Sequence, residues 1–264
     1  MKISLIITVF NSAKYVASAI DSFLAQDYLD KELIILDGKS TDKSHEIIAK
    51  YAEKFPNIKW IKENDSGISH ARNIALKQIS GDLVGFLGAD DILHKDFFTK
   101  MTYYAKINPN FDVIYFNSYT IGLTNSFDAS TQISITKRNL IKHCPIASGE
   151  SFYYKKSVFD KFSFNENNRY SMDYELNMAL VSSRKNNGEK YYFFPVNLEA
   201  VFNGSFGDSI SSASSLKQRI ETIVVQLKYA KNFGEKFSII YRKKKMILRN
   251  LKQFLEIKKK IGVL

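Results

Sequence analysis

The chain has 264 residues, of which 45% are hydrophobic, with one cysteine and a formal net charge of +11. A single cysteine excludes an internal disulfide framework and a cysteine-based zinc cluster, and it suits a reducing compartment. The sequence has no apolar run of the roughly 20 residues that a membrane-spanning helix needs, and its opening MKISLIITVF lacks the features of a secretory signal, so we expect a cytoplasmic protein.

The first hundred residues alternate between short apolar runs and helical patterns. Strands are expected at 2–9, 32–36, 58–61 and 83–87, with helices after Asn11 and Ser12, after Ser40 and Thr41, and over 68–79. This alternation is typical of a parallel sheet covered by helices. The sequence therefore predicts an α/β fold with a mostly parallel sheet.

The pattern becomes less regular after residue 100. A helix over 95–106, a strand over 112–116 and aromatic segments near 152–154 and 191–194 indicate an α+β half that completes the same sheet. Two further helices are expected at 216–233 and 236–260. We therefore divide the chain into a first half, 1–100, a second half of the same domain, 101–205, and a basic helical extension, 206–264.

Polar side chains follow each of the four predicted strands. They lie at 8–11, Asp37, 63–65 and the pair Asp90-Asp91. In a parallel sheet, ligands bind beyond the carboxyl ends of the strands. Adjacent carboxylates favour a Mg²⁺ or Mn²⁺ ion that phosphate oxygens help to coordinate, which describes a nucleotide diphosphate site. Taken singly, each motif also fits an ordinary turn or helix cap.

Together, the segments ITVFNS, ILDGKSTD, ENDSGISHARNIAL and GDLVGFLGADDIL resemble the nucleotide-binding half of family 2 glycosyltransferases, which have the GT-A (Rossmann-like) fold. The resemblance is strong over residues 3–100 and weaker afterwards. It implies an enzyme of bacterial surface polysaccharide or glycolipid assembly. Such an enzyme moves a sugar, with inversion, from a nucleotide-diphosphate sugar to a saccharide acceptor, and UDP is the expected nucleotide.

The same resemblance assigns roles to residues near the strand ends. A divalent cation, Mn²⁺ or Mg²⁺, is expected on Asp91 and Asp90. Many members of the family have a further acid where this chain has Gly88, which predicts a weaker metal site. Donor nucleotide contacts are expected from Thr8, Phe10, Asn11, Asp37, Asp65, Gly67, Arg72 and Asp90.

In the second half, the segment SMDYEL resembles the family motif that supplies a general base, and it assigns that role to Asp173. A carboxylate there can take the proton of the attacking sugar hydroxyl. Glu150 and Glu175 are the candidate acceptor contacts. Apart from the resemblance, Asp173 and Glu175 also fit acids that stabilise the first turn of a helix.

Residues 236–260 concentrate Lys and Arg around a single acid, Glu256. A basic amphipathic helix of this kind lies on an anionic membrane surface or packs on the catalytic core, and the sequence leaves both open. Membrane contact would suit a lipid-linked saccharide acceptor and a peripheral position on the inner face of the cell membrane.

Two other classes of protein fit parts of the sequence. A nucleic-acid-binding protein would use the basic tail, but it leaves the acidic strand ends unexplained, so no nucleic-acid partner is expected. A nucleotidyltransferase usually has a Gly- and Lys-rich phosphate loop, which ITVFNSAKY lacks. The sequence predicts neither the sugar nor the oligomeric state.

Overall fold

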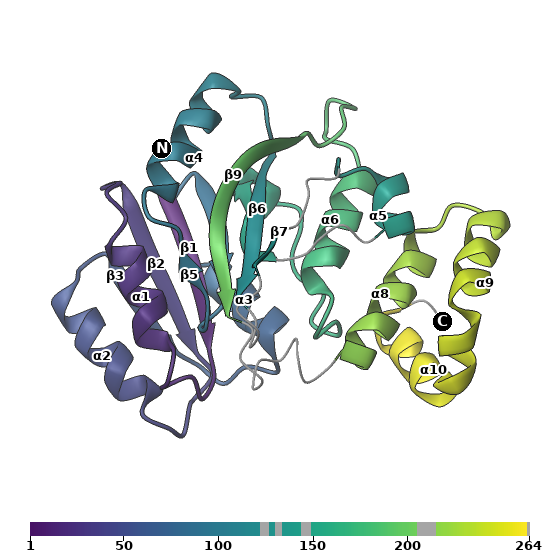
Figure 1. The fold of residues 1–264 in the computed structure, drawn as a ribbon, viewed down its shortest axis with the longest axis horizontal. Helices are drawn as coiled ribbons and strands as arrows, with labels where there is room; N and C mark the ends of the chain where they lie inside the picture. The colour runs from purple at the N-terminus through teal and green to yellow at the C-terminus, as the bar shows by residue number, and fades with distance from the viewer. Residues whose placement is uncertain (122–126, 130–133, 144–148, 205–214, 263–264) are drawn as a thin grey trace.

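The computed structural model describes residues 1–121, 127–129, 134–143, 149–204 and 215–262. Within these residues nine strands form one sheet in the order β3-β2-β1-β4-β8-β6-β9-β5, with β7 paired to β6. Helices pack on both faces of the sheet, and a group of three helices lies at the end of the molecule remote from β3 (Figure 1).

The first half of the sheet is parallel, as predicted. β1 (Ile3–Val9) lies between β2 (Lys31–Asp37) and β4 (Leu83–Leu87), and β3 (Ile58–Lys62) pairs with β2. The connections are α1 (Val16–Leu24), α2 (Ser44–Lys54) and α3 (Ile68–Leu76). The carboxyl ends of all four strands therefore meet at one edge, where the polar segments were expected to gather.

Alternation of side chains along β1 divides the core in two. Ile3, Leu5 and Ile7 face the cluster that includes α1, α2 and α4 (Phe97–Ile107), whereas Ile6 faces the cluster that includes α3. Both faces of a parallel sheet must be covered, so its strands are apolar throughout rather than at every second residue.

The second half of the sheet is mixed. β8 (Phe152–Lys155) runs antiparallel between β4 and β6 (Val113–Ile121), and β9 (Phe193–Gly204) runs parallel to β6. The sequence did not indicate two short strands, β5 (Ile92–Leu93) and β7 (Phe127–Ala129), because two or three residues carry too little pattern. The helical elements described in this half after β6 are α5 (Lys137–His143), η1 (Gly149–Ser151), η2 (Lys156–Val158) and α6 (Met172–Ser182).

Within 215–262, the described part of the C-terminal region, the structure has three helices where two were expected, α8 (Ser215–Tyr229), α9 (Phe233–Arg249) and α10 (Leu251–Lys260). α9 begins with reciprocal capping: Asn232 accepts a bond from the Glu235 N–H at 2.9 Å, and Glu235 accepts one from the Lys231 N–H at 2.7 Å. The predicted single helix over 236–260 is wrong because the chain breaks at Asn250. The side-chain amide of Asn250 donates to the Met246 carbonyl at 3.0 Å and so competes with the helical backbone.

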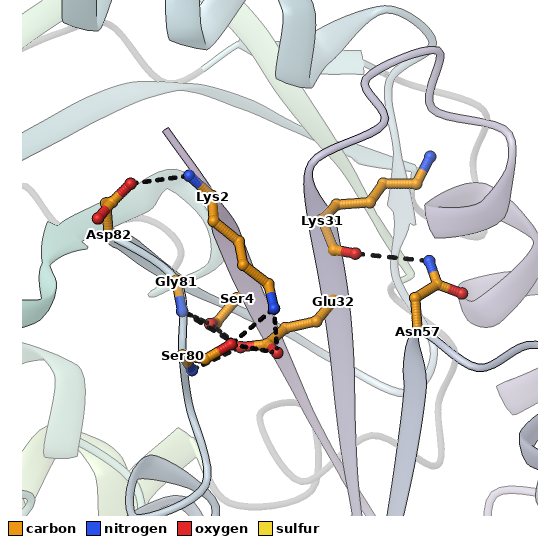
Figure 2. A network of polar contacts seen from close by, with 8 residues as sticks. All are labelled: Lys2, Ser4, Lys31, Glu32, Asn57, Ser80, Gly81 and Asp82. Atoms are coloured by element: carbon orange, nitrogen blue, oxygen red, sulfur yellow. Dashed lines mark hydrogen bonds and ion pairs between the residues drawn. The ribbon is translucent and has the colours of Figure 1, made fainter.

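A polar network fixes the other edge of the sheet, at the amino ends of β1 and β2 (Figure 2). Glu32 accepts hydrogen bonds from the Ser4 hydroxyl and from the Ser80 N–H and hydroxyl, and it forms a 2.9 Å ion pair with Lys2. Burial acts to raise the pKa of Glu32, but these bonds outweigh it and lower the pKa to about 2. The network thereby ties β1, β2 and the segment before β4 together.

No helix within the described part of the chain is both long enough and apolar enough to cross a lipid bilayer.

Candidate functional site

Hydrogen bonds join the loops after β1 and β2. The carboxylate of Asp37, the buried last residue of β2, accepts bonds from the N–H and hydroxyl of Ser40 at 2.9 and 2.7 Å. The Ser40 hydroxyl in turn accepts the Asn11 N–H at 2.9 Å, and the Asn11 side chain accepts the Thr41 N–H at 2.8 Å. Asn11 has φ of 50°, a left-handed conformation that asparagine tolerates better than most residues.

Ser40 and Thr41 therefore do not cap a helix as predicted, since α2 begins only at Ser44. They hold Asp37 and Asn11 in place at the end of the sheet. Ser and Thr favour hydrogen bonds to nearby groups, as the sequence indicated, but here Ser40 and Thr41 bond to Asp37 and to the loop at Asn11 instead of to a helix terminus.

The third strand end lies against the second. A side chain at Gly38 would collide with Asp65 Oδ2 and would lie 3.7 Å from the ring of Phe10. Phe10 itself is 65% exposed. Asp37, Asp65 and Phe10 are thus brought together as expected, and an exposed ring beside two carboxylates can stack on a planar base.

Asp65 also sets the start of α3. Its Oδ1 accepts the Gly67 N–H at 2.7 Å, and Gly67 has φ of +134°, which favours glycine. A side chain at Gly67 would meet the guanidinium of Arg169, with Nε 3.2 Å from the Cβ position. No local sequence pattern indicates that Arg169, 102 positions further along the chain, lies here.

Arg72 links α3 to the second half of the domain. Its guanidinium donates to Asp173 Oδ1 at 2.6 Å, and it lies over the rings of Phe86 and Phe164, 4.7 and 5.3 Å from their centroids. The Arg72 side chain is 4% exposed and that of Asp173 15%. A charge-assisted bond in this setting is strong and directional, so the predicted nucleotide-binding arginine and the predicted base lie in one site.

Gly149 packs directly on the Asp173 carboxylate. A Cβ at this position would lie 2.5 Å from Asp173 Cγ. Gly149, in the short helix η1, therefore forms a wall against the predicted base. Only a glycine allows this approach without moving the carboxylate.

The two acceptor candidates occupy different surroundings. Glu150 lies in η1 beside Gly149. Burial raises the pKa of Tyr154 well above its usual value, and the negative charges of Asp173 and Glu150 raise that pKa further. Glu175 is buried and accepts bonds from Asn168 at 2.8 Å and Lys228 at 2.7 Å. The structure places Glu175 between α6 and α8, so it supports a packing role rather than the expected acceptor contact.

The two acids after β4 converge on Gly88. A Cβ at Gly88 would lie 3.0 Å from Asp90 Oδ1 and would collide with Asp91 Oδ2. Burial raises the pKa of Asp90, since a desolvated carboxylate is costly when charged. A divalent cation would relieve that cost, so these oxygens fit a metal ion. The described residues contain no group of three or more His, Cys, Asp or Glu placed to hold one, and other ligands would have to come from a bound diphosphate.

Comparison with known proteins gives a consistent result. The family model described as Glycosyl transferase family 2 matches residues 4–163. The glycosyltransferase GlyA of Streptococcus pneumoniae serotype 4 is 31% identical over 182 residues, which are 69% of this chain and 23% of GlyA. The minor teichoic acid biosynthesis protein GgaB of Bacillus subtilis is 28% identical over 207 residues, 72% of this chain and 22% of GgaB. The chain spans about a quarter of the length of these curated relatives.

Solved structures show the same fold. TarS residues 1–349 of S. aureus, solved with UDP-GlcNAc, superposes with a TM-score of 0.71 at 18% identity, over 97% of this chain and 79% of that one. The mannosyltransferase PcManGT of Pyrobaculum calidifontis, solved with GDP-Man and Mn²⁺, gives a TM-score of 0.62 at 16% identity, over 98% of this chain and 73% of that one. These matches confirm the predicted GT-A fold.

Proposed function

Since this chain is a member of glycosyl transferase family 2, we propose that it moves a sugar from a nucleotide-diphosphate sugar to a saccharide acceptor. One observation carries the proposal beyond the family match: Arg72 of α3 is bonded to Asp173 of α6 at the edge of the sheet where the parallel strands end. The match itself stops at residue 163, before Asp173. The assignment of Asp173 therefore rests on this contact and on the sequence motif.

The donor nucleotide is proposed to lie across the ends of β1 and β2. Phe10 and Asp37 would face the base and ribose, with Thr8 and Asn11 beside them. Arg72 and the N-terminus of α3 at Gly67 would approach the diphosphate, since guanidinium groups and helix N-termini favour anions. Asp65 would shape the turn before α3, where it accepts the Gly67 N–H, and Asp90 would reach the ribose. UDP is the proposed nucleotide, and the TarS complex with UDP-GlcNAc supports it.

Asp90 and Asp91 are proposed to hold Mn²⁺ or Mg²⁺ together with the diphosphate, and PcManGT with its Mn²⁺ supports this. Bound there, the cation would stabilise the charge of the departing diphosphate. Because two carboxylates are a small share of a six-ligand shell, we expect affinity for the metal to depend on the nucleotide.

Asp173 is proposed to act as general base. Its carboxylate takes the proton of the acceptor hydroxyl while the hydroxyl oxygen bonds to the anomeric carbon and the bond to the diphosphate breaks. A single displacement of this kind inverts the anomeric configuration. Arg72 holds Asp173 Oδ1 at 2.6 Å and so restricts the direction of the carboxylate.

The test is Asp173→Asn, which keeps the size of the side chain and removes its ability to take a proton. Release of UDP from UDP-GlcNAc should fall by at least about 100-fold, in line with the usual contribution of a general base, while UDP still binds. Asp160→Asn, at an exposed position, is the matched control and should leave both unchanged. Full turnover in Asp173→Asn would show that another group takes the proton.

The acceptor is proposed to be a growing surface polysaccharide or a lipid-linked saccharide. The name of GgaB, a minor teichoic acid biosynthesis protein, supports this class, and Glu150, next to Gly149 in η1, is the proposed acceptor contact. A nucleic acid partner has no support from the relatives.

An anionic membrane surface on the cytoplasmic side is the second proposed partner, through the helix α9. Phe233, Phe237 and Tyr241 lie four residues apart and are 83%, 59% and 60% exposed, with ring centroids 6.3 and 6.1 Å apart along the helix. The opposite side of α9 is buried through Ile239 and Ile247, so this aromatic strip faces outward.

The charge around the aromatic strip favours anionic lipid. Between Phe233 and Lys260 there are ten Lys or Arg and two acids, a net charge of +8 within the chain's +11. Each cation near an anionic surface contributes about 1 kcal/mol, and exposed aromatic rings partition into the headgroup region. The curated relatives are glycosyltransferases and a teichoic acid biosynthesis protein, which is why we prefer a bilayer to nucleic acid.

Co-sedimentation with vesicles of phosphatidylserine and phosphatidylcholine tests this partner. Phe233→Ser combined with Phe237→Ser should weaken binding at least about fivefold, because it removes apolar area that burial stabilises. Tyr103→Ser on α4, at a side chain 61% exposed, is the matched control and should bind like the unmodified protein. Equal binding of the double variant, or of vesicles without phosphatidylserine, would contradict the membrane proposal.

A further inference from the structure

A buried carboxylate on α8 holds the chain immediately before α6. Glu221 is 3% exposed, and it accepts three consecutive backbone N–H groups, from Arg169 at 3.3 Å, Tyr170 at 2.7 Å and Ser171 at 3.0 Å. A charged group is costly to bury unless its oxygens are bonded. Three donors in succession indicate a built arrangement in which the backbone of 169–171 wraps around this side chain.

The position of this arrangement connects it to the reaction. Ser171 is the residue before α6, and Asp173 is the second residue of that helix. The N–H groups that Glu221 accepts, those of 169–171, immediately precede the first turn of α6, and a carboxylate placed near a helix N-terminus interacts favourably with the helix dipole. Glu221 supplies that carboxylate from another helix, α8. Its contact at Ser171 lies two positions before the proposed base, Asp173.

Other contacts from α8 flank the same turn. The Ser171 hydroxyl bonds to the Gln218 carbonyl and to the Thr222 hydroxyl, each at 3.0 Å, and Lys228 pairs with Glu175 at 2.7 Å. These bonds hold α6 both before and after Asp173. Burial raises the pKa of Glu221, with the backbone bonds opposing that shift and nearby Glu175 adding to it.

We propose that Glu221 is a positioning residue that fixes the first turn of α6 and thereby the direction of Asp173. This inference rests on the proposed function, in which Asp173 is the base. It makes α8 part of the catalytic unit, although the family match ends at residue 163 and the sequence placed α8 in an extension beginning at 206.

The arrangement also explains how Asp173 meets its other partners. Arg72 contacts Oδ1 from α3, and Gly149 packs on the carboxylate from η1. Neither contact fixes the backbone that carries Asp173. Glu221 restrains the backbone immediately before Asp173, together with Asn168, whose Oδ1 also accepts the Ser171 N–H at 3.0 Å.

The experiment is Glu221→Gln, which keeps the length of the side chain and removes the charge that accepts three N–H groups. Glu235→Gln on α9 is the matched control, because Glu235 also accepts a backbone N–H, at 2.7 Å, but belongs to another turn. Release of UDP from UDP-GlcNAc, with water in place of the acceptor, gives kcat and KM. Titration with UDP gives the affinity, and amide hydrogen exchange reports residues 169–171 directly.

Glu221→Gln should lower kcat between about tenfold and 100-fold, as expected for a small displacement of a catalytic group. KM and UDP affinity should stay within about twofold, and the amides of 169–171 should exchange faster while those of β1 do not. Glu221→Asp, which restores the charge, should recover part of kcat. Glu235→Gln should match the unmodified protein in every measurement.

An unchanged kcat in Glu221→Gln would overturn the positioning role. So would a loss of kcat that is matched by equal losses of UDP affinity and folded protein, since that pattern marks a general structural defect. Asp173→Asn, measured in parallel, separates the two proposals. Retained turnover in Asp173→Asn overturns the base assignment, whereas lost turnover there with normal turnover in Glu221→Gln overturns the positioning role alone.

Discussion

Replacement of Gly149 by alanine should lower the turnover number by displacing the proposed base, Asp173, whose own side chain is left unchanged. The added Cβ would lie 2.5 Å from Asp173 Cγ, whereas ordinary contacts begin at 3.4 Å, so the carboxylate has to move by about 1 Å. A misplacement of this size costs about 100-fold in rate, or about 2.7 kcal/mol. Gly149 does not have a positive φ, so alanine brings no backbone strain of its own.

The assay is release of UDP from UDP-GlcNAc, combined with a titration that gives UDP affinity. We expect kcat to fall about 100-fold while UDP affinity stays within about twofold, because the three atoms nearest to a Cβ at Gly149 all belong to Asp173 and none to a residue proposed to bind the nucleotide base. Gly234→Ala, where a Cβ would have a 3.5 Å contact with Asn232, is the control and should behave normally. Full turnover in Gly149→Ala would refute the reasoning that the position of Asp173 limits the reaction.

Two further substitutions test the structure around the site. Glu32→Gln should lower the free energy of unfolding by about 2 kcal/mol at pH 7, after allowance for partial exposure, as urea unfolding would show. The pKa of Glu32 is lowered to about 2, so its stabilisation is present above the unfolded value of 4.5 and is lost as the pH falls towards 2; the variant should therefore lose less stability on acidification. Arg72→Met should cost about 3 kcal/mol of folding free energy, because it leaves Asp173 beside a buried apolar surface without its partner, and it should also weaken UDP binding at least about tenfold. Unchanged unfolding in Glu32→Gln, or unchanged UDP affinity in Arg72→Met, would count against the respective account.

The parallel half of the fold could be predicted because every step left a strong local signal. Apolar runs of strand length, polar strand ends and helical periodicity alternate from Ile3 to Leu87. The gathering of Asp37, Asp65 and Phe10 then follows from topology alone, since parallel strands end at one edge.

The second half could not be predicted to the same extent because its contacts join residues far apart in the chain. Arg169 lies beside Gly67, Gly149 beside Asp173, and Glu221 beside 169–171. The residues around Gly67, Gly149 and Glu221 form no local sequence pattern that predicts contacts with such distant segments. The break at Asn250 was missed for a different reason: asparagine side chains bond to the backbone in many conformations, so the residue type alone does not mark the end of a helix.

Glu175 shows the limit of a motif carried over from a family. The motif correctly marked the start of α6, but the helical period turns Glu175 towards α8. There Glu175 pairs with Lys228 of α8, and it accepts bonds from Asn165 and Asn168, which precede α6. Residues two positions apart on a helix do not share a face, so Asp173 contacts Arg72 whereas Glu175 contacts Lys228 of α8.

Calorimetric titration with UDP, GDP, CDP and dTDP, each with and without Mn²⁺, tests the central claim most directly. We predict binding of UDP that strengthens with Mn²⁺, and loss of that metal dependence in Asp91→Ala, because Asp90 and Asp91 provide the carboxylates beside Gly88. Absence of binding for all four nucleotides, with or without the metal, would contradict the account.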